Sequence, residues 1–313
     1  MYITSRITDA SYSDIKKLYQ VCFGLNEPID QIRRKYATQE FGEKNVGFVA
    51  KSEGGDIAAY YGVFPLVLTQ NLKDFLVAQS GDTMTSLDHQ KKGLFTMLAK
   101  ETYTLCKELN ISLVFGFPNQ NSLPGFVKKL NWVFNGNMQK FNLRGAQFPF
   151  CELAFKYKWI LLVYNNYYRS KIKRYEVNPE TLDEGFFTSK DPDVYEVKKD
   201  SRFFKYKLSN PYNHFIKFNG FYMLVSLKIH LRIGLVNKFE PEKTSEFINA
   251  IQKLGKILKI RQVHVVVSDN HWLFKNLNEY IKSSQSLPIG ILSFDERIKS
   301  EDIQFTVADY DTF

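Results

Sequence analysis

The sequence is poor in cysteine and contains no cysteine pair of the kind that forms a metal or redox motif. Cys22, Cys106 and Cys151 are odd in number, far apart and mostly among apolar residues. They fit neither the disulfide framework of a small secreted protein nor a CxxC metal site. No HExxH motif or carboxylate triad occurs either, so we expect no bound metal.

Long apolar runs are also missing. The run Trp159–Tyr164 is far shorter than the roughly 20 residues that a membrane-spanning helix needs. Residues 1–14 contain no apolar core of signal-peptide length. We therefore expect a cytoplasmic protein without a membrane partner.

Dense blocks of one charge are absent, although the chain is basic overall. Lysine and arginine total 42 against 33 aspartate and glutamate, a net charge of +9. Such a balance favours anionic ligands, and both a nucleotide cofactor and a nucleic acid qualify. Because the lysines are spread along the whole chain, we expect no dedicated nucleic-acid surface. A nucleic-acid-binding protein would instead show affinity that falls steeply with salt.

What is present is enough apolar material for two folded domains. The chain has 313 residues, of which 44% are hydrophobic and 15% aromatic. This length is long for one domain and sufficient for two, each with its own core.

The most informative stretch is Ala78–Leu98, which has the pattern of a strand, a short polar loop and an amphipathic helix. Leu94, Leu98 and Leu105 share one helical face, which places the helix start close to Lys91–Gly93. The first turn of a helix has unpaired backbone N–H groups and a positive dipole, so it attracts anions. The sequence therefore predicts a pyrophosphate site made by Gln90, Lys91, Lys92, Gly93, Leu94 and Phe95.

This stretch resembles the acetyl-coenzyme A motif of the GNAT N-acetyltransferase superfamily, Gln/Arg-x-x-Gly-x-Gly/Ala. Gln90, Gly93 and Phe95 take its three positions, and Phe95 departs from the usual small residue. A basic, solvated helix start is the alternative interpretation.

A second motif follows in the same order as in that superfamily. After the strand-like run Ile111–Phe117, the residues Asn119, Ser122 and Phe126 resemble the family's Asn-x-x-Ala/Ser-x-x-x-Tyr segment. The resemblance implies that they pack beside the pantetheine and the thiol of the coenzyme. Phe126 stands where the family often has tyrosine, so the usual tyrosine general acid is expected to be missing.

The predicted elements of the first 145 residues also follow the GNAT order. A strand over 2–7 precedes two helices, a meander of strands between 48 and 85, a helix and a strand over 111–117. The resemblance implies an α/β (α+β) fold with a mixed, mostly antiparallel sheet flanked by helices.

The second half repeats this order without the cofactor motif. A helix or helix pair over 148–168 precedes a helical segment, two strand-like runs over 220–238, a helix over 244–258 and a strand over 263–268. Glu240 and Glu242 would repel a pyrophosphate. The arrangement resembles tandem GNAT proteins of bacterial polysaccharide biosynthesis, an unrelated α/β domain being the alternative. We predict a coenzyme-binding domain over 1–147, a connecting region over 148–200 and a degenerate GNAT-like domain over 201–313.

Roles can be assigned on the same resemblance. It implies direct attack of an amine on the thioester, with the carbonyl oxygen held by a backbone N–H near Met84, Thr85 and Ser86. Asp82, on the same strand, is the candidate general base; the alternative is a turn or bulge residue after Gly81. Asp309 and Asp311 would share a face of a terminal strand and hold the acceptor, unless they form a turn.

The sequence thus predicts an N-acetyltransferase that uses acetyl-coenzyme A as co-substrate and a primary amine as acceptor. An amino sugar or nucleotide sugar is the favoured acceptor, by analogy with the family. The alternatives are an aminoacyl or longer-chain acyl transferase and a non-catalytic protein that binds acyl-coenzyme A. The acyl-chain length and the oligomeric state stay open.

Overall fold

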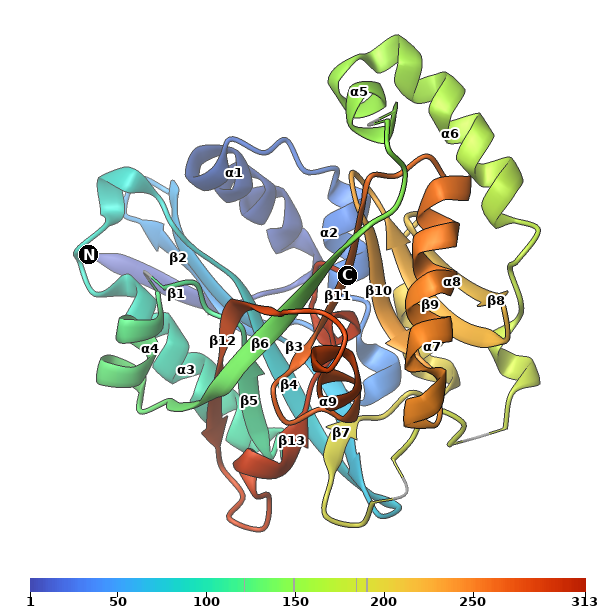
Figure 1. Cartoon of the computed structure of the whole chain (residues 1–313). Coiled ribbons are helices and arrows are strands. Elements are labelled where there is room, and N and C mark those ends of the chain that lie inside the picture. Colours follow the sequence, from blue (N-terminus) through green and yellow to red (C-terminus); the bar gives the residue numbers. More distant parts are fainter. Residues whose placement is uncertain (121, 149, 184, 190) are drawn as a thin grey trace. The chain divides into compact units, whose positions relative to one another are not determined.

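The computed structural model describes residues 1–120, 122–148, 150–183, 185–189 and 191–313. Within them the chain forms two compact units, which Figure 1 shows in sequence colours. The first unit contains Met1–Gly136, Pro192–Lys198 and Leu287–Ile303. The second contains Asn137–Asp191, Lys199–Ser286 and Gln304–Phe313. Residues 149, 184 and 190 of the predicted connecting region lie outside the described residues.

The two units are interleaved along the chain, whereas the sequence suggested consecutive domains. Strand β7 (Tyr195–Val197) pairs with β3 (Ile57–Gln70), and β12 (Ser284–Ser293) pairs with β5 (Leu113–Gly116). These pairings draw late segments back into the first unit. The division at 147 and 200 is therefore corrected, because local patterns carry no record of pairing between distant strands.

The first unit is built on a mostly antiparallel sheet with the order β1-β2-β3-β4-β5-β12. Its neighbours are antiparallel except for β4 and β5. The remaining elements of this unit are β1 (Tyr2–Arg6), α1 (Tyr12–Phe23), α2 (Ile29–Lys35), β2 (Val46–Ser52), β4 (Lys73–Thr85), α3 (Leu94–Glu108) and α4 (Leu123–Leu130). The predicted α/β fold class, a mixed and mostly antiparallel sheet flanked by helices, is confirmed.

The helices of the first unit pack through the faces that their sequences indicate. On α3 the predicted stripe Leu94, Leu98 and Leu105 is buried against the sheet. On α1 the residues Ile15 and Leu18 are fully buried. The apolar period of 3.6 residues therefore fixes which side of each helix faces the sheet.

The second unit repeats much of this element order on a sheet of β6-β11-β10-β9-β8. A helix pair precedes it, as predicted, and β10 and β11 are parallel like β4 and β5. Its elements are β6 (Val133–Arg144, whose residues from Asn137 onward belong here), α5 (Phe150–Lys156), α6 (Lys158–Ile172), α7 (Ser201–Leu208), β8 (Asn213–Phe218), β9 (Phe221–Leu227), β10 (Leu231–Val236), α8 (Thr244–Ile257), β11 (Gln262–Ser268) and α9 (Trp272–Asn278). The two-residue strand β13 (Ile303–Gln304) straddles the division between the units.

A buried histidine makes the second unit sensitive to acid. The His271 ring accepts the Leu273 amide at 3.1 Å and so caps α9. Burial, with the charges of Lys199 and Lys238, lowers the pKa of His271 to about 3. Between pH ~6.5 and pH ~3 the unfolded chain binds a proton that the folded chain does not, so stability falls as the pH falls.

We expect the variant His271→Asn to lose less stability in acid than the wild type. Asparagine is also a good N-cap but does not titrate, so the cap is kept. The fall in unfolding free energy between pH ~7 and pH ~4 should shrink by about 3 kcal/mol. Urea denaturation at the two pH values measures this, and an equal fall in both proteins would contradict it.

Candidate functional site

The site begins where two parallel strands separate. β4 pairs with β5 from Ala78 opposite Val114 to Ser80 opposite Gly116. β5 ends at Gly116, whereas β4 runs on to Thr85. A cavity of about 500 Å³ opens beyond the last paired residues, since β5 no longer occupies the space beside β4.

A bulge in β4 lies at the wall of this cavity. The ladder between β3 and β4 shifts so that Asp82 and Thr83 together face Tyr61. Asp82 adopts a left-handed backbone with φ 54°, and both bulge residues line the cavity. A bulge interrupts the ladder and can turn a backbone N–H away from the neighbouring strand.

The position expected for a free N–H donor, near Met84, Thr85 and Ser86, stays a prediction. Met84 and Thr85 are in register with Tyr60 and Ala59, and the Ser86 amide donates to the Ala58 carbonyl at 2.9 Å. Because the Ser86 amide bonds to β3, the Thr85 amide of this antiparallel ladder points away from β3. The register shift itself lies at Asp82 and Thr83.

A second cavity, of about 440 Å³, adjoins the first at the start of α3. Both cavities are lined by Phe23, Thr83, Thr85 and Phe95. The wall of the second also includes His89, Gln90, Lys91, Gly93, Leu94 and Thr96. The Met97 amide bonds to the Gly93 carbonyl at 3.0 Å, so the amides of residues 94–96 precede this helical bond. These donors and the helix dipole favour an anion at this cavity.

The loop before α3 has a backbone that few residues adopt easily. Lys91 and Gly93 have φ 60° and φ 79°. A Cβ at Gly93 would have open space, so the left-handed backbone, and not crowding, favours glycine in this loop. Lys91 lines the cavity, but the Lys92 ammonium donates to the Asp88 carbonyl at 2.9 Å and is turned from it. His89 is held by Tyr2, whose hydroxyl lies 2.9 Å from Nδ1.

The segment after β5 forms the opposite wall of the first cavity. The Asn119 side chain accepts the Ser122 amide at 2.9 Å and thereby fixes the start of α4. Asn119, Ser122 and Phe126 all line the cavity, and their contact with the coenzyme stays a prediction. The order of strand, turn and helix thus brings both motifs to one place.

The two departures from the family motifs contact one another. The Phe95 and Phe126 rings meet edge to face with centroids 5.2 Å apart, and Phe126 packs on Trp132 at 4.6 Å. Phe126 has no hydroxyl group that would need a hydrogen-bond partner. The large Phe95 side chain can therefore pack directly against its ring. We conclude that both replacements make one apolar wall.

Asp82 is held by an ion pair that the sequence did not reveal. The Lys35 ammonium lies 2.6 and 2.7 Å from the two carboxylate oxygens and donates to the Tyr19 hydroxyl at 3.1 Å. The Asp82 side chain is 9% exposed. Burial and the negative charge of Asp82 both raise the pKa of Tyr19. A carboxylate therefore stands at the cavity wall in a fixed orientation.

A chain of buried hydroxyl groups also ends at this cavity. The Tyr61 hydroxyl lies 2.9 Å from Ser80 Oγ and 2.8 Å from the Tyr103 hydroxyl, which accepts from Trp132 Nε1 at 2.9 Å. Burial raises the pKa of Tyr61 and Tyr103, so both hydroxyls stay protonated at neutral pH. Ser80 is the member that lines the cavity.

Close packing of Trp132 on glycine shapes the cavity floor. Gly116 and Gly290 pair across β5 and β12, and a Cβ at Gly290 would come within 2.6 Å of the Trp132 ring. We expect Gly290→Ala to lower the unfolding free energy by about 1 to 3 kcal/mol, because the ring must shift in a packed core. Gly54→Ala, where a Cβ meets atoms at 3.7 Å or more, is the matched control. Equal urea midpoints for both variants would contradict this prediction.

The aspartates predicted to hold the acceptor have structural partners. The terminal strand expected there is a short 3-10 helix, Val307–Asp309. Asp309 is buried, pairs with Lys199, and accepts from the Thr306 amide at 2.7 Å. Burial lowers the pKa of Lys207 to about 7, and the charges of Asp309 and Asp311 oppose that shift. The assignment of Asp309 to acceptor binding is therefore wrong.

The same C-terminal segment fills the corresponding place in the second unit. β10 and β11 also separate, after Ile233 opposite Val265, and β10 has a register shift at Gly234. The Phe313 ring packs directly on Gly234. The gap that forms a cavity between β4 and β5 is thus occupied by an aromatic side chain.

Sequence reasoning missed Lys35, Tyr19, Ser80 and Tyr61. No local pattern singles them out, and only the fold brings Lys35 to Asp82, with Tyr19 beside it, and Tyr61 to Ser80 at the cavity. Within the described residues, no cluster of histidine, cysteine, aspartate or glutamate has a geometry suited to a metal ion. No helix in the described part of the chain is long and apolar enough to cross a membrane.

Comparison with known proteins gives a family match for the part of the chain that carries the site. Residues 4–134 match the family model of the acetyltransferase (GNAT) domain. No curated protein sequence matches this chain.

Solved structures resemble the chain over nearly its whole length. A GCN5-related N-acetyltransferase from Kribbella flavida is 11% identical, with a TM-score of 0.60 over 94% of this chain and 71% of that chain. A protein of unknown function from Enterococcus faecalis V583, described as a probable N-acyltransferase, is 11% identical, with a TM-score of 0.59 over 94% and 73%. A GCN5-related N-acetyltransferase from Anabaena variabilis is 9% identical, with a TM-score of 0.53 over 93% and 72%. At these identities the likeness establishes the fold.

Proposed function

We propose that the protein, whose residues 4–134 match the family model of the acetyltransferase (GNAT) domain, is an acyltransferase that transfers an acetyl group from acetyl-coenzyme A to the primary amine of a small molecule. One observation carries the proposal. Two adjoining cavities lead from the start of α3 to Asp82, past the bulge in β4.

The coenzyme is assigned to the two cavities by chemistry. Its pyrophosphate takes the cavity at the start of α3, where the amides of residues 94–96 and Lys91 offer donors and positive charge. The pantetheine then passes Thr85 and Phe95, which line both cavities. This places the thioester beside the bulge at Asp82 and Thr83.

Transfer follows from this placement. The amine nitrogen attacks the thioester carbonyl carbon, a C–N bond forms, and the C–S bond breaks as the thiolate leaves. The developing negative charge on the carbonyl oxygen is stabilised by a backbone N–H of the bulge. Asp82 accepts the proton that the amine loses. The departing thiolate takes a proton from water in the cavity, where Ser80 is hydrogen-bonded to Tyr61.

An amino sugar or nucleotide sugar is the acceptor we favour, and a cytoplasmic location goes with it. The support is the family analogy and the exposure of the cavity beside Asp82, not a built sugar site. The second unit, whose corresponding gap is filled by Phe313, would then be a GNAT-like copy that binds no coenzyme.

A second candidate is a protein that binds acyl-coenzyme A without turning it over. The contact between Phe95 and Phe126 favours it, because it replaces the hydroxyl of the usual general acid with an apolar wall. The same wall would suit an acyl chain longer than acetyl, which is the catalytic alternative.

The test is a thiol-release assay with a panel of amino sugars and other primary amines. Acetyl-, butyryl- and octanoyl-coenzyme A are compared as donors, with calorimetric titration of each donor alongside. Amine-dependent release of free thiol supports the proposal, and the preferred donor gives the chain length. Tight binding with no release for any amine would favour the non-catalytic protein. Absence of binding would contradict both.

A further inference from the structure

The helix α6 of the second unit has two apolar faces. One face packs into the core of that unit, through Tyr164 and Tyr168. The other carries Trp159, Leu162 and Val163, which are 72%, 70% and 60% exposed. A surface helix normally presents charged or polar residues on its outer side. An exposed stripe of this kind marks a place where something else binds.

The exposed stripe on α6 is flanked by further exposed aromatic residues and by basic residues. Phe148 and Tyr157, on either side of α5, are also exposed. On the same outer side of α6, one to three turns further along, lie Arg169 and Lys173, which are exposed. The outer face of the helix is therefore apolar in its first half and basic in its second.

The α5–α6 hairpin is strongly basic. Residues 150–174 contain a single acidic residue, Glu152, against Lys156, Lys158, Arg169, Lys171, Lys173 and Arg174. Basic residues together with tryptophan, leucine and tyrosine are typical of a helix that lies in a membrane interface. Such a helix needs no membrane-spanning segment.

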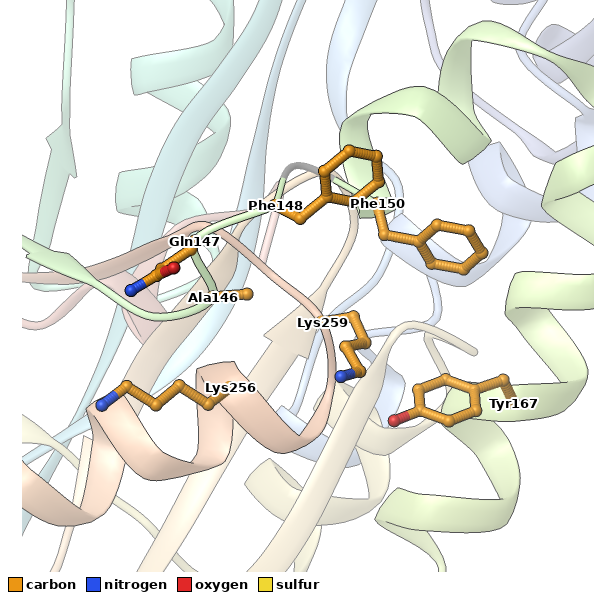
Figure 2. A pocket seen from close by; sticks show the side chains of 7 residues that line it. All are labelled: Ala146, Gln147, Phe148, Phe150, Tyr167, Lys256 and Lys259. Atoms are coloured by element: carbon orange, nitrogen blue, oxygen red, sulfur yellow. The ribbon is translucent and has the colours of Figure 1, made fainter.

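A cavity beside the hairpin has the same mixed character. It measures about 520 Å³ and is lined by Phe148, Phe150, Tyr167, Lys256 and Lys259, among others. Figure 2 shows the two phenylalanine rings on one side of it and the two lysine side chains on another. Apolar walls next to two ammonium groups suit an amphipathic anion.

From these observations we propose that the α5–α6 hairpin and the adjoining cavity form a docking surface for anionic phospholipid. Trp159, Leu162 and Val163 enter the acyl-chain boundary. The lysines and arginines contact the phosphate groups, which lie at the level of the interface. The sequence predicted no membrane partner. We propose instead that the protein binds to the surface of a membrane without crossing it.

The experiment is sedimentation of the full chain with vesicles of phosphatidylcholine alone or of equal parts phosphatidylcholine and phosphatidylglycerol. We expect binding to the mixed vesicles, weakened by salt, and little binding to phosphatidylcholine. Trp132 is buried and Trp272 is only partly exposed, whereas Trp159 is 72% exposed, so quenching of tryptophan emission by brominated lipid would come chiefly from Trp159.

Two paired variants locate the surface. Trp159→Ser with Leu162→Ser should reduce vesicle binding at least tenfold, whereas Leu72→Ser, at a residue on the β3–β4 turn that is 95% exposed, should not. Lys256→Glu with Lys259→Glu should also reduce it at least tenfold. Lys100→Glu with Lys128→Glu makes the same change in net charge elsewhere on the surface and should have a smaller effect.

Several results would overturn the proposal. These are absence of binding to the mixed vesicles, equal binding to phosphatidylcholine alone, and equal losses in the control variants. A dimer that dissociates in Trp159→Ser with Leu162→Ser, without vesicle binding by the wild type, would assign the stripe to a second copy of the chain.

Discussion

Asp82→Asn is expected to slow amine acetylation by about a hundredfold or more, while acetyl-coenzyme A binds as tightly as before. Asparagine keeps the shape of the side chain but cannot accept the amine proton. The backbone of the bulge also tolerates it, since asparagine adopts a left-handed conformation readily. Initial rates of thiol release and calorimetric titration of the coenzyme measure the two effects. Unchanged turnover would remove Asp82 from the mechanism.

The variant Lys35→Met distinguishes two roles of Asp82, a general base that Lys35 positions or a carboxylate that serves only the structure. The Lys35 ammonium lies 5.7 and 5.6 Å from the centroids of the Tyr19 and Phe64 rings, and a methionine side chain of similar length is expected to lie beside the same rings. Without the ammonium, the ionised form of Asp82 loses its partner. The acid limb of the pH–rate profile should then move to higher pH, while a good part of the maximal rate is kept. A profile that keeps its wild-type midpoint, with the rate lowered in proportion to a loss of folded protein, would assign the pair a structural role.

The local part of the site could be predicted because its signals are local. The leucine stripe of α3, the glycine before it and the Asn119–Ser122 turn all act within a few residues of one another. Helical period, left-handed backbone and helix capping are properties of short segments. The structure therefore brings these residues together at the two adjoining cavities.

The parts that could not be predicted depend on contacts between distant segments. Lys35 and Asp82 are 47 positions apart, and no pattern near either residue indicates the other. The placement of β12 beside β5 and of Phe313 on Gly234 is of the same kind. Asp309 illustrates the consequence. Its spacing from Asp311 suggested a strand face, but its energetics are set by the buried Lys199 that packs against it.

The second large effect is expected at the anion cavity at the start of α3. Gly93→Trp is expected to weaken acetyl-coenzyme A binding by about a hundredfold or more, because an indole ring would occupy the anion cavity at the start of α3. The substitution also strains the backbone, because Gly93 has φ 79°. Gly55→Trp shares that cost without touching the cavity, since Gly55 has φ 84° and open space around it in the β2–β3 turn. Calorimetric titration of both variants thus isolates the blocked site from the strain. Loss of binding in Gly93→Trp alone would place the coenzyme at the start of α3. Equal affinities in the two variants would mean that the pyrophosphate binds elsewhere. This conclusion does not depend on the result for Asp82→Asn.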